Sequence, residues 1–423
     1  MINLTKLYLG LETPSDALRY GTAPAGHGGG PASDTVSREV PVTAGTRKPI
    51  VVWTTSRRCN LRCVHCYADS EDRFYPDELT DDDAARMLED LAQFGIPALL
   101  MSGGEPLAHP RFFERAAMAR RLGLRVTIST NGTLIDRPTA ERIKALGVSY
   151  VGISFDGLGR TNDIFRGRAG AFDAALAGVR HLKAINQKVG LRFTLTRRNF
   201  EALPHIFELV EREGIDRVCF YHLVYSGRGS RISKDDLTHE ETRRVLDDIC
   251  AWAIALQSLA RPVEILTVDN HVDGVYLYLK LLREDPQRAA WARQLIEWNG
   301  GGANSSGVGI ANIDSYGHVH PDQFWQTHSL GNVRQRPFSA IWSDNTDPIL
   351  AGLRNRLPLL KGRCGACRWQ AMCGGSFRVR ALQATGDPWA PDPACYLSDE
   401  EIGLAPAAPP VAACSAKSSG HGE

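Results

Sequence analysis

The stretch RRCNLRCVHCYA, residues 57–68, carries Cys59, Cys63 and Cys66 in the spacing C-x3-C-x2-C. It directly follows PIVVWTT (residues 49–55), an apolar run of strand length, so the thiols are expected in a loop at the end of that strand. Three thiolates on one short loop can hold three corners of a four-iron cluster and leave the fourth iron without a protein ligand.

Two simpler interpretations of these cysteines stay open at this point. The Cys-x2-Cys pair could be half of a zinc site that Cys364 and Cys367 complete, or it could be a dithiol redox pair. The chain has ten cysteines, and clustered thiols in a reducing cytosol indicate metal or redox chemistry before disulfides. Cys219, Cys250 and Cys414 stand alone, and we expect no metal role for them.

A βα rhythm continues from the first strand. Further apolar runs of strand length lie at residues 97–101, 125–129, 150–154, 189–195 and 217–222. Helical patterns lie at residues 81–94, 111–122, 137–146, 171–185, 203–213, 238–259 and 276–298. Six strands that alternate with amphipathic helices require parallel pairing and right-handed crossovers. The expected fold class is α/β, a partial (β/α)6 TIM-like barrel with its chemistry at the carboxyl ends of the strands.

The barrel is expected to occupy residues 49–299. Residues 1–48 are rich in Gly, Pro, Ala and Ser and predict a flexible lead-in, and residues 404–423 predict a disordered tail of the same character. Residues 300–403 change to short strands and turns and end in a second cysteine cluster, which predicts a small C-terminal domain.

Composition excludes several function classes. The chain of 423 residues has 49 Lys and Arg against 48 Asp and Glu, so no long-range field attracts a nucleic acid or a membrane surface. No apolar run approaches the ~18–20 residues of a membrane-spanning helix, and residues 1–10 lack an apolar signal core. We therefore predict a cytoplasmic protein with neither a nucleic-acid nor a membrane partner.

Small and polar residues follow the predicted strands. MSGGEPLAHP comes after the second strand, STNG after the third and GISFDG after the fourth, while Arg192 lies within the fifth. Gly103 and Gly104 allow a close backbone approach, and Glu105 is a carboxylate suited to an ammonium group. Each motif alone is common in turns, but all of them meet at one mouth of the barrel.

The C-x3-C-x2-C loop followed by GGEP resembles the radical S-adenosylmethionine (SAM) enzymes over roughly residues 50–260. The resemblance implies that Cys59, Cys63 and Cys66 ligate a 4Fe-4S cluster whose open iron binds SAM and forms a 5′-deoxyadenosyl radical. It also implies that Gly103–Glu105 contact the methionyl amine and that His65 lies against the adenine. The remaining SAM contacts implied by position are Ser129, Asn131, Ser154, Asp156 and Arg192.

A second cysteine set has the spacing C-x2-C-x5-C-x21-C and comprises Cys364, Cys367, Cys373 and Cys395. Four thiols suit a structural zinc or a fully ligated iron–sulfur cluster, and beside a radical SAM barrel we favour a second 4Fe-4S cluster. The arrangement resembles SPASM/Twitch extensions. Because Asp322 stands where the full pattern has an upstream cysteine, a third cluster is not expected, and Asp322 is interpreted as a turn residue.

Longer strings, among them FYHLVYSGRG and TGDPWAPDPACYL, resemble the NirJ family of radical SAM proteins in heme d1 biosynthesis. The resemblance implies removal of two propionate chains from 12,18-didecarboxysiroheme, with a flavodoxin or ferredoxin as electron donor. Such a substrate needs cationic clamps and flat walls. Candidate clamps are Arg166, Arg168, Arg228, Arg231 and Arg334, and candidate walls are Tyr221, Tyr225, Trp325 and Trp342. One of His222, His271, His318, His320 and His328 could ligate the substrate iron or donate a proton.

Three alternatives remain from the sequence. Two are other radical SAM enzymes, either a heme-pathway decarboxylase or a peptide maturase of the SPASM type. The maturase would usually need a peptide-recognition domain, and residues 11–46 are too rich in Gly and Pro to build one. The third alternative is a binding protein stabilised by zinc, which iron and sulfide analysis separates from an enzyme.

Overall fold

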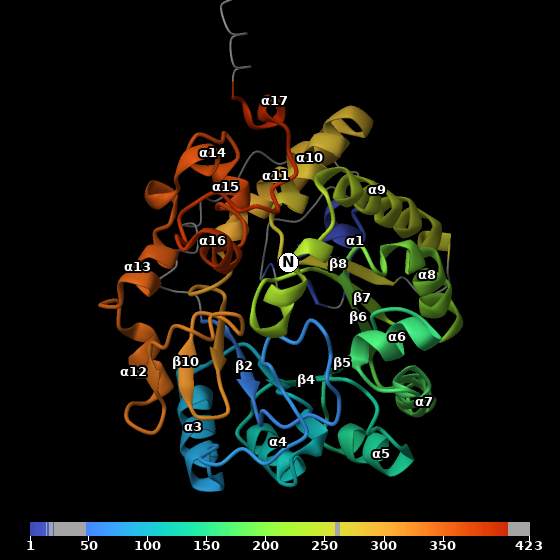
Figure 1. Cartoon of the computed structure of the whole chain (residues 1–423), viewed down its shortest axis with the longest axis vertical. Helices are drawn as coiled ribbons and strands as arrows, with labels where there is room; N and C mark the ends of the chain where they lie inside the picture. Colours follow the sequence, from blue (N-terminus) through green and yellow to red (C-terminus); the bar gives the residue numbers. More distant parts are fainter. Residues whose placement is uncertain (14, 17–19, 21–47, 259–262, 405–423) are drawn as a thin grey trace, which may run out of the picture.

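The computed structural model describes residues 1–13, 15–16, 20, 48–258 and 263–404. One sheet of eleven strands runs through it in the order β1-β8-β7-β6-β5-β4-β3-β2-β9-β10-β11, with helices packed around its outer face (Figure 1). The strands are β1 (Ile2–Asn3), β2 (Ile50–Thr54), β3 (Leu99–Ser102), β4 (Val126–Thr130), β5 (Tyr150–Ser154), β6 (Val189–Leu195), β7 (Arg217–His222), β8 (Glu264–Val268), β9 (Ile310–Ile313), β10 (His318–His320) and β11 (Gly331–Asn332).

All six predicted strands are present as β2–β7 and pair in parallel, so the partial barrel is confirmed. The prediction missed β8, which extends the parallel set beside β7. Its sequence EILTV begins with a charged residue, Glu264, which is buried and accepts a hydrogen bond from Arg217 Nε at 2.7 Å. A charged residue at the start of so short a run hides the strand pattern.

The helices are α1 (Leu4–Leu7), α3 (Asp81–Phe94), α4 (Phe112–Arg121), α5 (Arg137–Ala145), α6 (Gly159–Arg166), α7 (Ala171–Ala184), α8 (Leu203–Arg212), α9 (His239–Ala255), α10 (Val272–Glu284), α11 (Pro286–Trp298), α12 (Phe338–Ser343), α13 (Pro348–Arg354), α14 (Gly362–Gly365), α15 (Gln370–Cys373), α16 (Arg378–Thr385) and α17 (Asp399–Ile402). The helix predicted at 276–298 is two helices, since Pro286 ends α10 and Asp285 caps α11. No helix of the described ranges is long and apolar enough to cross a membrane.

The N-terminal residues extend one end of the parallel set. Strand β1 pairs antiparallel with β8, and Leu4 and Leu7 of α1 are buried in the core. The flexible lead-in predicted for residues 1–48 therefore does not extend to residues 1–13, while residues 21–47 lie outside the described ranges. Most of the predicted tail, with Cys414, lies outside them too.

The C-terminal part begins within the same sheet. Strand β9 pairs in parallel with β2, so the sheet continues across the boundary predicted near residue 299. Short helices α12 to α17 follow, with α12 packed against α3 and α15 packed against α10 and α11 (Figure 1). Arg380 of α16 joins the two parts, since it pairs with Asp392 at 2.8 Å and donates to the backbone oxygens of Leu223 and Asp269.

Candidate active site

A pocket of about 1120 Å³, its open mouth included, lies at the carboxyl ends of the parallel strands. Strands β2 to β7 each contribute to its wall, with Val52, Leu100, Ser102, Ser129, Ser154, Arg192, Thr194, Tyr221 and His222. Ligands of such folds bind in concave sites at this face of the sheet, so the pocket is the candidate active site.

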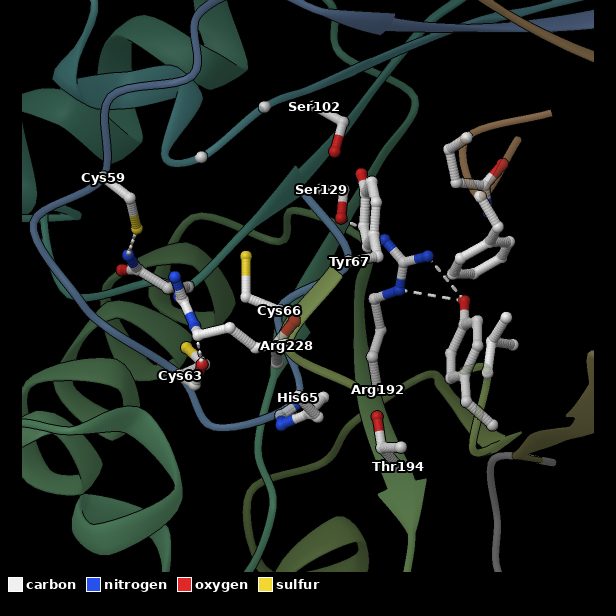
Figure 2. Close-up of a pocket in the computed structure, with 18 of the residues that line it drawn as sticks. Cys59, Cys63, His65, Cys66, Tyr67, Ser102, Ser129, Arg192, Thr194 and Arg228 are labelled. Carbon is white, nitrogen blue, oxygen red and sulfur yellow. Dashed lines mark hydrogen bonds between the residues drawn. The ribbon is translucent and has the colours of Figure 1, made fainter. Parts of the chain in front are cut away.

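The cysteine loop, residues 57–68, forms one side of this pocket, and the thiols of Cys59, Cys63 and Cys66 all line it (Figure 2). Arg228 holds the loop in place from a segment far along the chain. Its Nε donates to Cys63 O at 2.7 Å, and its backbone N–H donates to Cys66 O at 2.9 Å. The three thiols thus line one pocket, and their role as cluster ligands stays a prediction.

Nearby donors are directed at two of the sulfurs. The N–H of Leu61 lies 3.4 Å from Cys59 Sγ, Asn131 Nδ2 lies 3.9 Å from the same sulfur, and Arg166 lies 3.6 Å from Cys63 Sγ. Burial raises the pKa of the Cys59 thiol to about 12 and also raises that of Cys63. Iron binding must therefore expel protons, and these donors stabilise the thiolates that result.

Gly103 and Gly104 follow β3 and lie against the backbone of the cysteine loop. A Cβ atom on Gly104 would meet Arg58 O at 2.4 Å, and one on Gly103 would meet Ser56 O at 2.6 Å. Because both obstacles are backbone atoms, any side chain here would displace the loop. The two glycines line the pocket, where their backbone is open to a ligand.

Glu105 lies behind the wall of the pocket and is fully buried. Its Oε1 accepts from the Thr130 hydroxyl at 2.7 Å and from Leu107 N–H at 3.0 Å, and its Oε2 accepts from Asn131 N–H at 2.8 Å. Burial raises the pKa of this carboxyl to about 7. In this structure Glu105 ties the end of β3 to the end of β4, and a contact with the methionyl amine stays a prediction.

We expect Glu105→Ala to lower the free energy of unfolding by about 2–4 kcal/mol, because it leaves buried donors without an acceptor. Urea unfolding of the protein without iron or SAM measures this. The matched variant Glu105→Gln keeps an acceptor oxygen and should lose less. Unchanged stability of the alanine variant would show that Glu105 does not act through these hydrogen bonds.

Arg192 on β6 faces the cysteines from the other side of the pocket (Figure 2). Its guanidinium donates to the Ser129 hydroxyl and to the Tyr221 hydroxyl, at 2.9 Å from Nε to the latter. Ser129 and Ser154 are on β4 and β5 and also line the pocket. A fixed cation between hydroxyl groups suits a carboxylate ligand.

Asp156 follows β5 and is fully buried outside the pocket lining. Its carboxylate pairs with Arg166 at 2.7 Å and with His65 Nε2 at 3.3 Å. Through Arg166 it orients a donor toward Cys63, and through His65 it orients an imidazole that lines the pocket. In this structure Asp156 thus positions Arg166 and His65 and does not itself line the pocket.

Four buried polar atoms of the pocket residues have no hydrogen-bond partner: His65 Nδ1, Arg166 Nε, one terminal guanidinium nitrogen of Arg228 and Gln323 Oε1. Burial lowers the pKa of His65, so the unpaired Nδ1 is an acceptor in a neutral ring. Leaving such atoms unpaired costs about 1–3 kcal/mol each. Together with three convergent thiols, they fit a polar cofactor beside a metal cluster, as SAM beside a 4Fe-4S cluster would be.

The predicted tetrapyrrole clamps are only partly brought together. Of the five arginines, Arg166 and Arg228 line the pocket, and both are committed to the cysteine loop. Arg334 does not line the pocket. Its Nε instead donates to Asp83 in the first turn of α3, at 3.0 Å. The ring of arginines expected around the substrate is therefore not present, and Arg168, Arg231, Tyr225, Trp325, Trp342, His271, His318, His320 and His328 are also absent from the lining.

Asp322 is a buried residue close to the pocket. Its carboxylate accepts from the Ser306 hydroxyl and from Phe324 N–H at 2.7 Å, and burial raises its pKa to about 6. These bonds are those of a turn aspartate, which agrees with the interpretation from the sequence.

A second pocket of about 1010 Å³ contains Cys364, Cys367, Cys373 and Cys395 in its wall. Among the residues that the structure describes, no three His, Cys, Asp or Glu side chains come close enough to hold a single metal ion. Four thiols in one wall suit a structural zinc or a fully ligated iron–sulfur cluster, and a 4Fe-4S cluster here stays a prediction.

Tyr67, Thr194 and Ser102 line the first pocket but were not predicted. Thr194 could have been found, because it lies two residues after Arg192 on one strand and therefore shares its face. Tyr67 directly follows the third cysteine, which is the only signal the sequence offers for it.

Comparison with known proteins gives three findings. The family model "Radical SAM superfamily" matches residues 53–210. Fe-coproporphyrin III synthase of Methanosarcina barkeri is 50% identical over 95% of this chain and 99% of its own length. Pre-heme d1 synthase of Dinoroseobacter shibae is 48% identical over 86% of this chain and 90% of its own length.

The fold is similar to that of SuiB from Streptococcus suis, solved with the precursor peptide SuiA. The TM-score is 0.66 at 19% identity, and the match covers 83% of this chain and 76% of that one. At this identity the likeness concerns the fold alone. It supports the partial barrel.

Proposed function

The chain belongs to the radical SAM superfamily, and on that premise we propose that it removes carboxylate side chains from an iron tetrapyrrole. The observation that carries this proposal is the identity of 50% and 48%, over most of the chain, to two synthases named for iron tetrapyrrole products. The peptide-bound structure is similar in fold at only 19% identity, so a peptide substrate has weaker support.

We propose 12,18-didecarboxysiroheme as the substrate and loss of two propionate chains as the reaction. When bound at the first cysteine loop, the 4Fe-4S cluster and SAM would supply a radical able to abstract hydrogen from a side-chain carbon. The protein would position the reactants: Cys59, Cys63 and Cys66 hold the cluster, the glycines after β3 offer backbone to the methionyl group, and Arg192 faces a carboxylate. His65, whose Nδ1 has no hydrogen-bond partner, would lie against the adenine.

The four C-terminal cysteines would hold a second 4Fe-4S cluster. Hydrogen abstraction followed by side-chain loss leaves an electron to be removed, and a fully ligated cluster can accept it without changing its ligands. Reductive cleavage of SAM also needs an external low-potential donor, for which we propose a flavodoxin or a ferredoxin.

A second product is favoured by a specific observation, since the relative at 50% identity makes Fe-coproporphyrin III. The two products differ in the side chains that remain, because that compound keeps its propionates. Anaerobic incubation with SAM, reductant and 12,18-didecarboxysiroheme, followed by mass analysis, separates them. We expect loss of two propionates; a product that keeps them would identify the second activity, and unchanged porphyrin with abundant 5′-deoxyadenosine would reject this substrate.

A further inference from the structure

His222 at the end of β7 lines the first pocket, and its surroundings go beyond what SAM binding requires. Its Nε2 lies 2.9 Å from Asp273 Oδ2. The other oxygen of Asp273 accepts from the Tyr396 hydroxyl at 2.8 Å. All three side chains are buried, and Asp273 is fully so. The result is a fixed line of hydrogen bonds that ends at an imidazole on the pocket wall.

The direction of these bonds determines which atom of His222 is available. A carboxylate accepts, so Nε2 carries the ring proton and donates it to Asp273. Nδ1 is then the acceptor nitrogen. Within the described ranges, Asp273 is the one hydrogen-bond partner of the His222 ring. An imidazole that donates one N–H to a buried carboxylate and directs its other nitrogen to a pocket is the usual arrangement of a metal-ligating histidine.

The neighbours of His222 are mostly apolar. Leu223, Val224, Tyr221 and Phe324 line the pocket with it, together with the buried carboxyl of Asp269, which interacts electrostatically with His222. The only other imidazole in this lining, His65, belongs to the cysteine side and is paired with Asp156. The two histidines of the lining thus have different partners.

We propose that His222 Nδ1 is the axial ligand of the iron at the centre of the tetrapyrrole, with Asp273 and Tyr396 as its positioning residues. This inference rests on the proposed function. An axial bond sets the height and tilt of the macrocycle in the pocket. Only the side chains on the edge that faces the cysteine loop then come within reach of the radical, so His222 also determines which carbons react.

The line of hydrogen bonds also reaches the second cysteine site. Tyr396 directly follows Cys395, which lines the second pocket, and it packs edge-on against Tyr276 of α10 at 5.5 Å between ring centroids. The segment that carries the fourth cysteine therefore also orients the substrate ligand. Asp273 is held from both sides, which suits a residue that must not move when substrate enters.

The test is electron paramagnetic resonance of the full-length protein with both clusters oxidised, titrated with ferric coproporphyrin III and without SAM. The wild-type protein with ¹⁵N-labelled histidine should show coupling of the ferric iron to a histidine nitrogen. His222→Ala should lose this coupling and show coupling to the nitrogen of ¹⁵N-labelled imidazole when that is added. Asp273→Asn should weaken binding about 10-fold or more, since the acceptor of the ring proton loses its negative charge. His205→Ala, exposed on α8, is the control and should match the wild type.

The outcomes separate the inference from the proposed function. If His222→Ala binds the ferric probe with the same histidine coupling and affinity as the wild type, the inference is wrong. If the wild-type protein binds no iron tetrapyrrole, the proposed function itself fails. His222→Gln, together with iron content and circular dichroism, shows whether a loss of coupling reflects misfolding, and a folded, iron-loaded variant without coupling supports the axial ligand.

Discussion

Cys66→Ala is expected to abolish the formation of 5′-deoxyadenosine, down to the level of a mixture without protein. The cysteine loop offers three thiols to the first pocket. A 4Fe-4S cluster with only two protein ligands would be bound less firmly, and it would no longer have a single iron without a protein ligand. The second site uses other cysteines and should keep its iron. We therefore expect iron and sulfide to fall by about half in this variant while the protein stays folded.

The control for this experiment is Cys250→Ala. Cys250 is buried in α9 as a lone thiol, outside both pockets. Its removal tests whether loss of any thiol disturbs iron loading, and we expect full iron content and full 5′-deoxyadenosine formation. Normal 5′-deoxyadenosine formation by Cys66→Ala would contradict the assignment of the first cluster.

Arg380→Met is expected to lower the free energy of unfolding by about 3–5 kcal/mol. Arg380 and Asp392 are both fully buried and joined by two hydrogen bonds, at 2.8 and 3.1 Å. The variant leaves the Asp392 carboxylate buried without its cation, and it also removes donors from the backbone of Leu223 and Asp269 beside the first pocket. One substitution thus loosens both cysteine sites.

Denaturant unfolding under anaerobic conditions measures this loss, with Arg137→Met as the control. Arg137 pairs with Glu141 on the surface of α5, with side chains 80% and 55% exposed. Such exposed pairs contribute about 0–1 kcal/mol. Equal losses in the two variants would show that burial of the Arg380–Asp392 pair does not join the two parts of the molecule.

The cysteine loop and the parallel strands could be predicted because their signals are local. Ligand spacing is read from a few neighbouring residues, and an apolar run followed by an amphipathic helix repeats along the chain. Arg192 and the serines at the strand ends were located for the same reason. Parallel strands of one sheet direct their carboxyl ends to the same edge.

The supporting residues could not be predicted, since their partners are distant in sequence. Arg228 and Arg166 were expected to bind substrate, yet each holds the cysteine loop from more than 100 positions away. Glu105 and Asp156 were predicted as SAM contacts, but whether a carboxylate faces a pocket or lies behind its wall depends on tertiary contacts that the sequence does not show. Asp273 was missed because one aspartate in a helix has no pattern of its own.

The central claim is that this protein generates a radical that acts on a tetrapyrrole side chain. The direct measurement is transfer of deuterium from 12,18-didecarboxysiroheme, labelled on its side-chain carbons, into 5′-deoxyadenosine during anaerobic turnover with SAM and reductant. We predict 5′-deoxyadenosine that carries deuterium and that forms faster when the tetrapyrrole is present. Unlabelled 5′-deoxyadenosine, formed at the same rate with and without the tetrapyrrole, would contradict the claim.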